Sequence, residues 1–194
     1  MTNLDFRKLT LEQIRSIYYD DMVRQFPDSE RRSYANIADM IQRGIYGGYG
    51  LFDGGRICAY ALAALFPEKH AVLLDYLAVP VELHGQGYGS EMLSRLRSHF
   101  GITDRILIET EDPLVLEGAV SATAQRRLGF YKRNGYRETA VRIYLFSVWY
   151  RLYVNDIGAE DENCLLEMMT EIYHEIVPPR LYTKNVHLQL REEG

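Results

Sequence analysis

The 194-residue sequence is poor in cysteine, has fewer basic than acidic residues, and lacks long apolar runs. Its two cysteines, Cys58 and Cys164, match no metal-binding spacing. One stands in a strand-like segment and the other in a helix-like one. We therefore expect two reduced, buried thiols and no metal site.

The charge balance also excludes classes of function. Lysine and arginine number 22 against 27 aspartates and glutamates, a formal net charge of −5. With no basic run, this argues against a nucleic-acid-binding surface. No apolar run reaches the ~18 residues of a membrane span. Residues 1–10 are polar, unlike a signal peptide. We expect a cytoplasmic protein that binds neither nucleic acid nor membrane.

Lysine is missing near the most distinctive segment of the chain. Three glycines alternate at Gly85, Gly87 and Gly89, but no lysine lies between Lys69 and Lys132. This absence excludes the Gly-x-x-x-x-Gly-Lys-Ser/Thr pattern of a P-loop. The glycines must serve another purpose.

The glycine triplet stands between a predicted strand and a predicted helix. Residues 72–79 are apolar and β-prone, and residues 80–84 form a short loop. After the glycines, Met92, Leu93, Leu96 and Phe100 share one helical face. This order aims unpaired N–H groups and a helix dipole at one point, where a phosphate or pyrophosphate can bind. Glycine permits both close approach and positive φ there.

A dinucleotide-binding loop is one alternative. Gly85 and Gly87 fit the first two positions of G-x-G-x-x-G, but Ser90 occupies the third. Five residues also separate the strand from the first glycine. Glu109, about twenty residues on, could bind a ribose as that fingerprint requires. The alternative therefore stays open at this point.

The elements before the triplet predict an antiparallel meander. Residues 4–9 alternate as a strand, and Thr10 with Gln13 predicts a capping box for a helix over 11–22. Asp28 or Ser29 is expected to cap a second helix that ends near residue 44. Strands are expected over 49–52 and 56–66, joined by a turn at 53–55. A meander before the glycine loop argues against a Rossmann fold.

The elements after the triplet begin with a β-prone run, residues 105–110, which predicts a parallel crossover from the strand before the loop. A helix is expected over 124–134, ended by Gly135. A hairpin of strands 139–146 and 147–154 should follow. Beyond a polar linker, a helix over 162–177, stopped by two prolines, and a strand over 186–190 complete the chain. We expect one domain with an appendage.

Two segments carry a resemblance to a known family. The run His84-Gly85-Gln86-Gly87-Tyr88-Gly89 resembles motif A of the GNAT acetyltransferase superfamily, Q/R-x-x-G-x-G/A. The run 126–136, with Phe130-Tyr131 and then Gly135-Tyr136, resembles its motif B. The resemblance implies an acetyl-CoA site made by Leu77, Ala78 and Val79 for the pantetheine arm, and by His84, Gly85, Gln86, Gly87, Tyr88, Gly89 and Ser90 for the pyrophosphate.

Two positions depart from the family pattern. His84 replaces the usual glutamine or arginine, and a neutral imidazole offers one hydrogen bond in place of arginine's fixed charge. Ala124 stands where the family often has an asparagine, so one pantetheine hydrogen bond is expected to be missing. These departures leave open a non-catalytic CoA-binding module of the same fold.

The resemblance also suggests catalytic residues. Tyr131 matches the tyrosine that protonates the leaving thiolate, a transfer for which a phenol is suited. Glu109 matches the glutamate often found in the fifth strand. Asp75 is a second candidate base and Glu111 a third, because carboxylates within apolar strands are costly without a reason.

The family implies an α/β fold with a mixed, mostly antiparallel sheet, flanked by helices and split by a V-shaped cleft between residues 77–79 and the strand ending near Glu109. Residues 1–154 would form the acetyltransferase domain. Residues 155–194 would form an extension that packs on it, covers the acceptor cleft or forms a homodimer. The implied reaction moves an acetyl group from acetyl-CoA to a primary amine of a small molecule or peptide by direct attack in a ternary complex. The acceptor pocket is expected near residues 26–49 and in the tail.

Overall fold

The computed structural model describes residues 4–101, 104–115, 118–155 and 161–191. The chain forms two compact units. The first contains residues 1–67 and 71–104, and the second contains residues 68–70 and 105–194. Among the described helices, none combines the length and the apolar character needed to cross a membrane.

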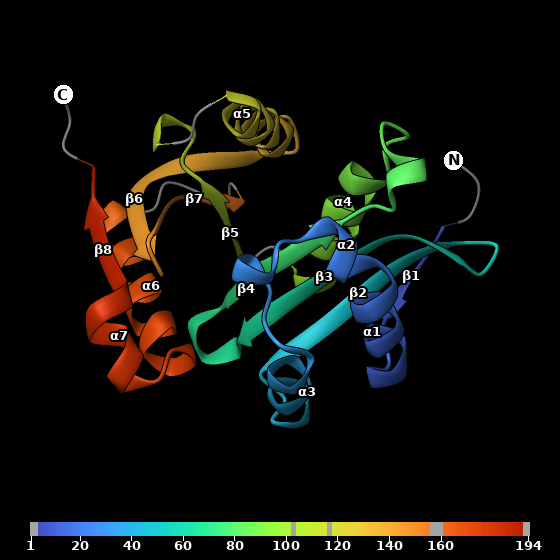
Figure 1. Cartoon of the computed structure of the whole chain (residues 1–194), viewed down its shortest axis with the longest axis horizontal. Helices are drawn as coiled ribbons and strands as arrows, with labels where there is room; N and C mark the ends of the chain where they lie inside the picture. The colour runs from blue at the N-terminus through green and yellow to red at the C-terminus, as the bar shows by residue number, and fades with distance from the viewer. Residues whose placement is uncertain (1–3, 102–103, 116–117, 156–160, 192–194) are drawn as a thin grey trace. The chain divides into compact units, whose positions relative to one another are not determined.

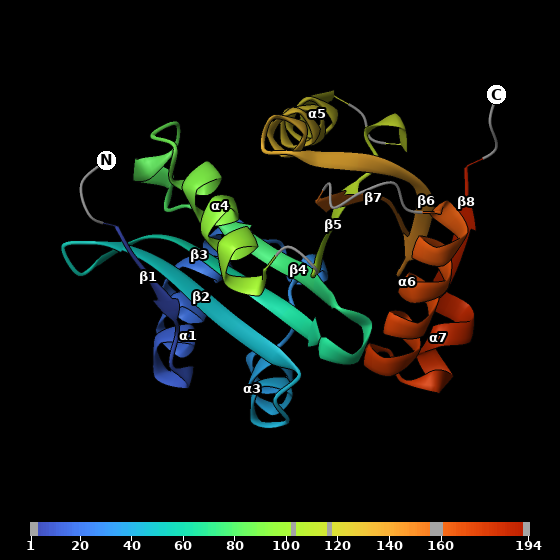
Figure 2. The same cartoon turned by 180° about the vertical axis from the view of Figure 1, so that it is seen from behind.

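The sheet of the first unit is the predicted meander. Its strands β1 (Asp5–Lys8), β2 (Tyr46–Asp53), β3 (Arg56–Phe66) and β4 (Ala71–Ala78) pair antiparallel in sequence order. A two-residue turn at Gly54 and Gly55, both with positive φ, joins β2 to β3 as expected. Figures 1 and 2 show α4 (Tyr88–Phe100) on one face of this sheet, with α1 (Leu11–Ile17) and α3 (Tyr34–Gln42) on the other.

The N-terminal helical segment changes its geometry twice. The capping box of Thr10 and Gln13 begins α1 (Leu11–Ile17), as predicted. A π-helical turn (Tyr18–Met22) follows, and then the short α2 (Val23–Gln25). Phe26 is extended and ends the segment. Such π-helical turns are rare in proteins, and many of those that occur lie at functional sites.

The predicted cap of the second helix is wrong. Ser33, not Asp28 or Ser29, caps α3 (Tyr34–Gln42), and its hydroxyl accepts from the backbone N–H of Asn36. Residues Asp28–Glu30 form only a 3₁₀ turn. The carboxylate of Asp28 is ion-paired with Arg31, whose backbone is extended, so it does not cap a continuing helix.

The sheet of the second unit has the order β5 (Arg105–Glu111), β7 (Val148–Asn155), β6 (Tyr136–Leu145), β8 (Val186–Leu190), and these pairs are all antiparallel. The predicted hairpin of β6 and β7 is present. Its turn uses Phe146 and Ser147, with φ of 46° and 74°, values that residues other than glycine seldom adopt. The final strand is also confirmed and pairs along β6.

Helices of the second unit differ in part from expectation. The helix α5 (Gly118–Arg133) begins earlier than predicted and ends, as expected, just before Gly135, whose φ is 79°. The helix α6 (Glu162–Ile176) is present, but Cys164 in its first turn is exposed, so the prediction of two buried thiols holds only for Cys58. A further helix, α7 (Pro179–Asn185), was not predicted, because the double proline indicated only a stop. Proline fits the first turn of a helix, and Pro179 occupies it here.

The core of each unit is built from the faces that the sequence pattern indicated. Met92, Leu93 and Leu96 of α4 are buried in the first unit. Leu165, Met169 and Ile172 of α6 are buried in the second. In β2, a Cβ on Gly48 would lie 2.7 Å from the side chain of Ile14, so glycine allows α1 to pack close to the sheet.

Candidate active site

The glycine loop of the first unit presents an exposed helix N-terminus. After β4 the chain makes a 3₁₀ turn (Val81–Leu83) and reaches Gly85 and Gly87, with φ of 76° and 89°. A Cβ on Gly85 would meet nothing within 4 Å, so glycine is needed there for its conformation and not for space. Gly87 is the N-cap of α4 and provides no side-chain cap. The first N–H groups of a 13-residue helix are therefore available for an anion.

His84 contacts the backbone of the preceding strand. Its Nε2 lies 2.9 Å from the carbonyl oxygen of Val79. A carbonyl only accepts, so Nε2 must carry the proton. The ring thereby closes the loop between β4 and the glycines. A phosphate contact from His84 stays a prediction, and it would require either a proton on Nδ1 as well or release of Nε2 from Val79.

The same carbonyl of Val79 has a second donor. The side-chain amide of Gln25 lies 3.2 Å from it and also donates, at 2.5 Å, to the carboxylate of Asp21. A carbonyl oxygen has two lone pairs, and these two donors use both. A pantetheine arm bound along Leu77, Ala78 and Val79 would have to use other backbone groups of that strand or displace one donor.

Asp75 is held by two partners. Its carboxylate lies 2.5 Å from Nε of Arg32 and 2.7 Å from the hydroxyl of Tyr46, and only 16% of its side chain is exposed. The charge of Asp75 is the main cause of a raised pKa of Arg32. The role of Asp75 as a base stays a prediction, and this geometry argues against it.

Tyr131 is a buried phenol in the second unit. Its ring, on α5, contacts the rings of Phe130, Tyr136 and Tyr153. Burial raises the pKa of Tyr131 to about 12. The hydroxyl is therefore protonated at neutral pH and can donate a proton to a thiolate.

Glu109 lies on the opposite face of the same sheet from Tyr131. The register pairs Glu109 with Leu152 and the preceding Ile108 with Tyr153, so Glu109 and Tyr153 project to different faces. Tyr131 packs against Tyr153, whereas Glu109 accepts a hydrogen bond from the hydroxyl of Tyr173 on α6. The two candidates cannot exchange a proton directly across the strand. Glu111, the third candidate, pairs with Tyr150 further along β5.

Sequence patterns missed three polar side chains near the end of β4. The hydroxyl of Tyr60 donates to the carboxylate of Asp21 at 2.7 Å, and Gln25 joins that carboxylate to Val79. Burial is the main cause of a raised pKa of Tyr60. The helical spacing of Asp21 and Gln25 was a usable signal, since residues four apart on a helix are neighbours. Nothing local pointed to Tyr60.

Comparison with known proteins identifies the family. The model of the family described as "Acetyltransferase (GNAT) family" matches residues 11–136, which include both motif-like segments. Comparison with curated proteins gave no match.

Solved structures share the fold. A GNAT-family protein of Bacteroides thetaiotaomicron has a TM-score of 0.71 at 22% identity, covering 89% of this chain and 97% of that one. The ribosomal-protein-S18-alanine N-acetyltransferase of Escherichia coli has a TM-score of 0.56 at 18% identity, covering 83% and 98%. A ribosomal L7/L12 alpha-N-protein acetyltransferase in complex with coenzyme A has a TM-score of 0.57 at 16% identity, covering 81% and 97%.

These likenesses confirm the expected fold class, a mixed and mostly antiparallel sheet flanked by helices. The family match extends over well over half of the chain and includes the glycine loop and Tyr131. The chain therefore belongs to the GNAT acetyltransferase family.

Proposed function

We propose that this protein transfers an acetyl group from acetyl-CoA to a primary amine. The observation that carries the proposal is the exposed N-terminus of α4, preceded by two glycines in the left-handed region. In a member of the GNAT family, such a loop suits the pyrophosphate of CoA. Membership of the family and the CoA-bound structural neighbour support this choice of cofactor.

The proposed chemistry is direct attack in a ternary complex. The neutral amine attacks the thioester carbonyl, the C–S bond breaks, and the thiolate leaves. Tyr131 donates the proton that converts the thiolate to a thiol, and the proton lost by the amine passes to Glu109 through water, since Glu109 lies on the opposite face of the sheet from Tyr131. The ion pair of Asp75 with Arg32 suits a structural role better.

The cofactor would be held mainly by main-chain groups. Residues 77–79 would bind the pantetheine arm and residues 84–90 the pyrophosphate. Both regions lie in the first unit, and His84 and Gln25 fix the end of β4 between them.

A non-catalytic CoA-binding module is the second candidate function. Two observations favour it. The ring of His84 is engaged by Val79, and Ala124 is buried where a polar partner for pantetheine is expected. Dinucleotide binding is disfavoured, since the strand before the loop ends an antiparallel meander, whereas the dinucleotide fingerprint follows the first strand of a parallel sheet.

The experiment is a thermal-shift series with acetyl-CoA, CoA and NAD, followed by thiol release over a panel of primary amines. We expect stabilisation by both CoA species and thiol release with at least one amine. Stabilisation by neither CoA species would refute the cofactor proposal, and stabilisation by NAD alone would restore the dinucleotide alternative. Stabilisation without thiol release for any amine would favour the non-catalytic module.

A further inference from the structure

Asp21 is a half-buried carboxylate placed by the π-helical turn of the first unit. It accepts from the hydroxyl of Tyr60 at 2.7 Å and from the amide of Gln25 at 2.5 Å. Both donors reach the same oxygen, Oδ2. Among the described residues, nothing donates a hydrogen bond to Oδ1.

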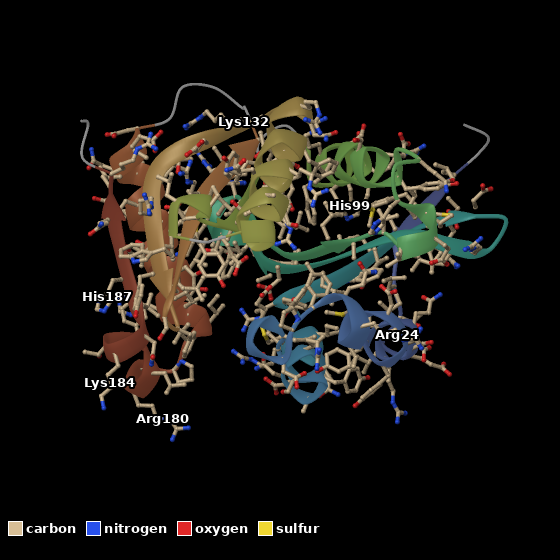
Figure 3. The ribbon with its side chains drawn as sticks, turned by 45° about the horizontal axis from the view of Figure 1, so that its top comes forward. Arg24, His99, Lys132, Arg180, Lys184 and His187 are labelled. Carbon is tan, nitrogen blue, oxygen red and sulfur yellow. The ribbon has the colours of Figure 1, made fainter. Side chains whose placement is uncertain are left out.

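Asp21 also has no cationic partner within the described part of the chain. Even Arg24, one turn further along the same helical segment (Figure 3), forms no ion pair with it. The partly buried carboxylate of Asp75 and the buried carboxylate of Asp112 differ in this respect, because each is paired with arginine. Partly buried carboxylates are costly unless a cation or several donors compensate them. Asp21 has two neutral donors and one free oxygen, an arrangement that a positively charged ligand would complete.

The position of Asp21 connects its Oδ1 atom with the proposed reaction. Gln25 bonds both Asp21 and the carbonyl of Val79, the first residue beyond β4. Asp21 is therefore linked through one side chain to the strand end proposed to hold the pantetheine arm. Asp21, Gln25 and Val79 all belong to the first unit, so the link is internal to it. Asp21 also lies five residues before the segment 26–49, where the acceptor pocket is expected.

We propose that Asp21 binds the acceptor amine in its ammonium form, through Oδ1, and that the ammonium group releases one proton to solvent water before the neutral amine attacks. The inference rests on the proposed function and deepens it, since it names a carboxylate that selects amines over neutral alcohols and thiols. Tyr60 and Gln25 are positioning residues, because they fix Oδ2 and leave Oδ1 directed to the ligand. The acceptor class is a primary amine that is charged in solution and not sterically blocked.

Binding of a simple ammonium ion tests the proposal without knowledge of the acceptor. The probe is ethylammonium chloride, titrated without acetyl-CoA and followed by ¹⁵N–¹H spectra of the protein. Tetramethylammonium chloride at equal ionic strength is the control, because it has the charge but no N–H donor. We expect saturable shifts at the Gln25 side-chain amide and at residues around Asp21 with ethylammonium alone.

Two matched variants make the test specific. Asp21→Asn removes the charge and keeps an acceptor for Tyr60, and Asp20→Asn removes a neighbouring exposed carboxylate that bonds Ser16 instead. We expect Asp21→Asn to weaken ethylammonium binding by about 10- to 100-fold, the value of a hydrogen bond to a charged group. Asp20→Asn should bind like the wild type. Absence of saturable shifts in the folded wild type, or equal binding by Asp21→Asn, would overturn the proposal.

Steady-state kinetics separate this proposal from the proposed function. With any amine that releases thiol, Asp21→Asn should raise the KM for that amine by about 10- to 100-fold and leave the Kd of acetyl-CoA unchanged. An unchanged KM for the amine would refute the role of Asp21. Failure of acetyl-CoA to bind would refute the proposed function instead, and the ethylammonium titration would still decide the role of Asp21.

Discussion

The proposed mechanism depends most on the hydroxyl group of Tyr131. Tyr131→Phe removes this hydroxyl and leaves the ring contacts with Tyr136 and Tyr153 in place. We expect kcat to fall by about 10²- to 10⁴-fold, the usual contribution of a positioned acid. The Kd of acetyl-CoA should not change, because its phosphates would bind at the glycine loop before α4. Nearly full kcat in this variant would show that the thiolate leaves without Tyr131.

The two candidate bases can be distinguished by their effects on rate and on stability. Glu109→Gln should lower the rate near neutral pH, with recovery toward high pH, where the free amine is abundant. Asp75→Asn should leave that profile unchanged but lower the free energy of unfolding by about 1–3 kcal/mol, because Arg32 and Tyr46 lose a charged partner. A pH–rate profile measures the effect on rate, and urea denaturation measures the free energy of unfolding.

A surface carboxylate provides the control for Asp75. Asp39 pairs with Arg43 on α3, and both side chains are more than half exposed. Asp39→Asn should change stability by less than about 0.5 kcal/mol. If Asp75→Asn alters the pH profile and Glu109→Gln does not, the two roles must be exchanged.

At the scale of an element, the loop before α4 is predicted to bind the cofactor through its backbone. Gly85→Ala places a Cβ in open space at a φ of 76°, so the variant folds around a strained or altered loop. We expect a loss of stability of about 1–2 kcal/mol together with a clearly weaker acetyl-CoA affinity, measured by calorimetry.

Gly44 offers a matched control for that substitution. It follows α3, has the same φ of 76°, and a Cβ there would also meet nothing within 4 Å. Gly44→Ala should therefore cost similar stability and leave acetyl-CoA affinity unchanged. Equal affinity losses in the two variants would mean that general strain, and not the loop, weakens binding.

At the scale of the whole molecule, buried tyrosines should make stability sensitive to alkali. Burial raises the pKa of Tyr49 and of Tyr131 to about 12, one in each unit. The unfolded chain releases these protons near pH 10, whereas the folded chain keeps them. The unfolded state then binds fewer protons, so the free energy of unfolding falls as pH rises.

The contribution of these tyrosines is fully present below about pH 10 and is lost between about pH 10 and 12. Urea denaturation at a series of pH values from neutral upward measures it. Tyr49→Phe should reduce the fall in the free energy of unfolding over this pH range. A free energy of unfolding that stays constant over this range would contradict the expectation.

The sequence alone determined the features that depend on neighbouring residues. The order of strand, glycine loop and helix followed from hydrophobic periodicity, and the capping box at Thr10 followed from residues three apart. The family resemblance followed from the same local segments. Two local signals failed. Asp28 does not cap α3, because its carboxylate forms an ion pair with Arg31, and the double proline does not only end a helix, because Pro179 begins α7.

Only the tertiary structure decided what the polar side chains contact. The partner of Asp75 is Arg32, 43 residues away, and the carbonyl of Val79 accepts from Gln25, 54 residues away. The register of β5 with β7 placed Glu109 and Tyr131 on opposite faces of one sheet. Such contacts follow from strand pairing and helix packing between segments that are distant in the sequence. Periodicity and residue spacing carry no information about which distant segments meet.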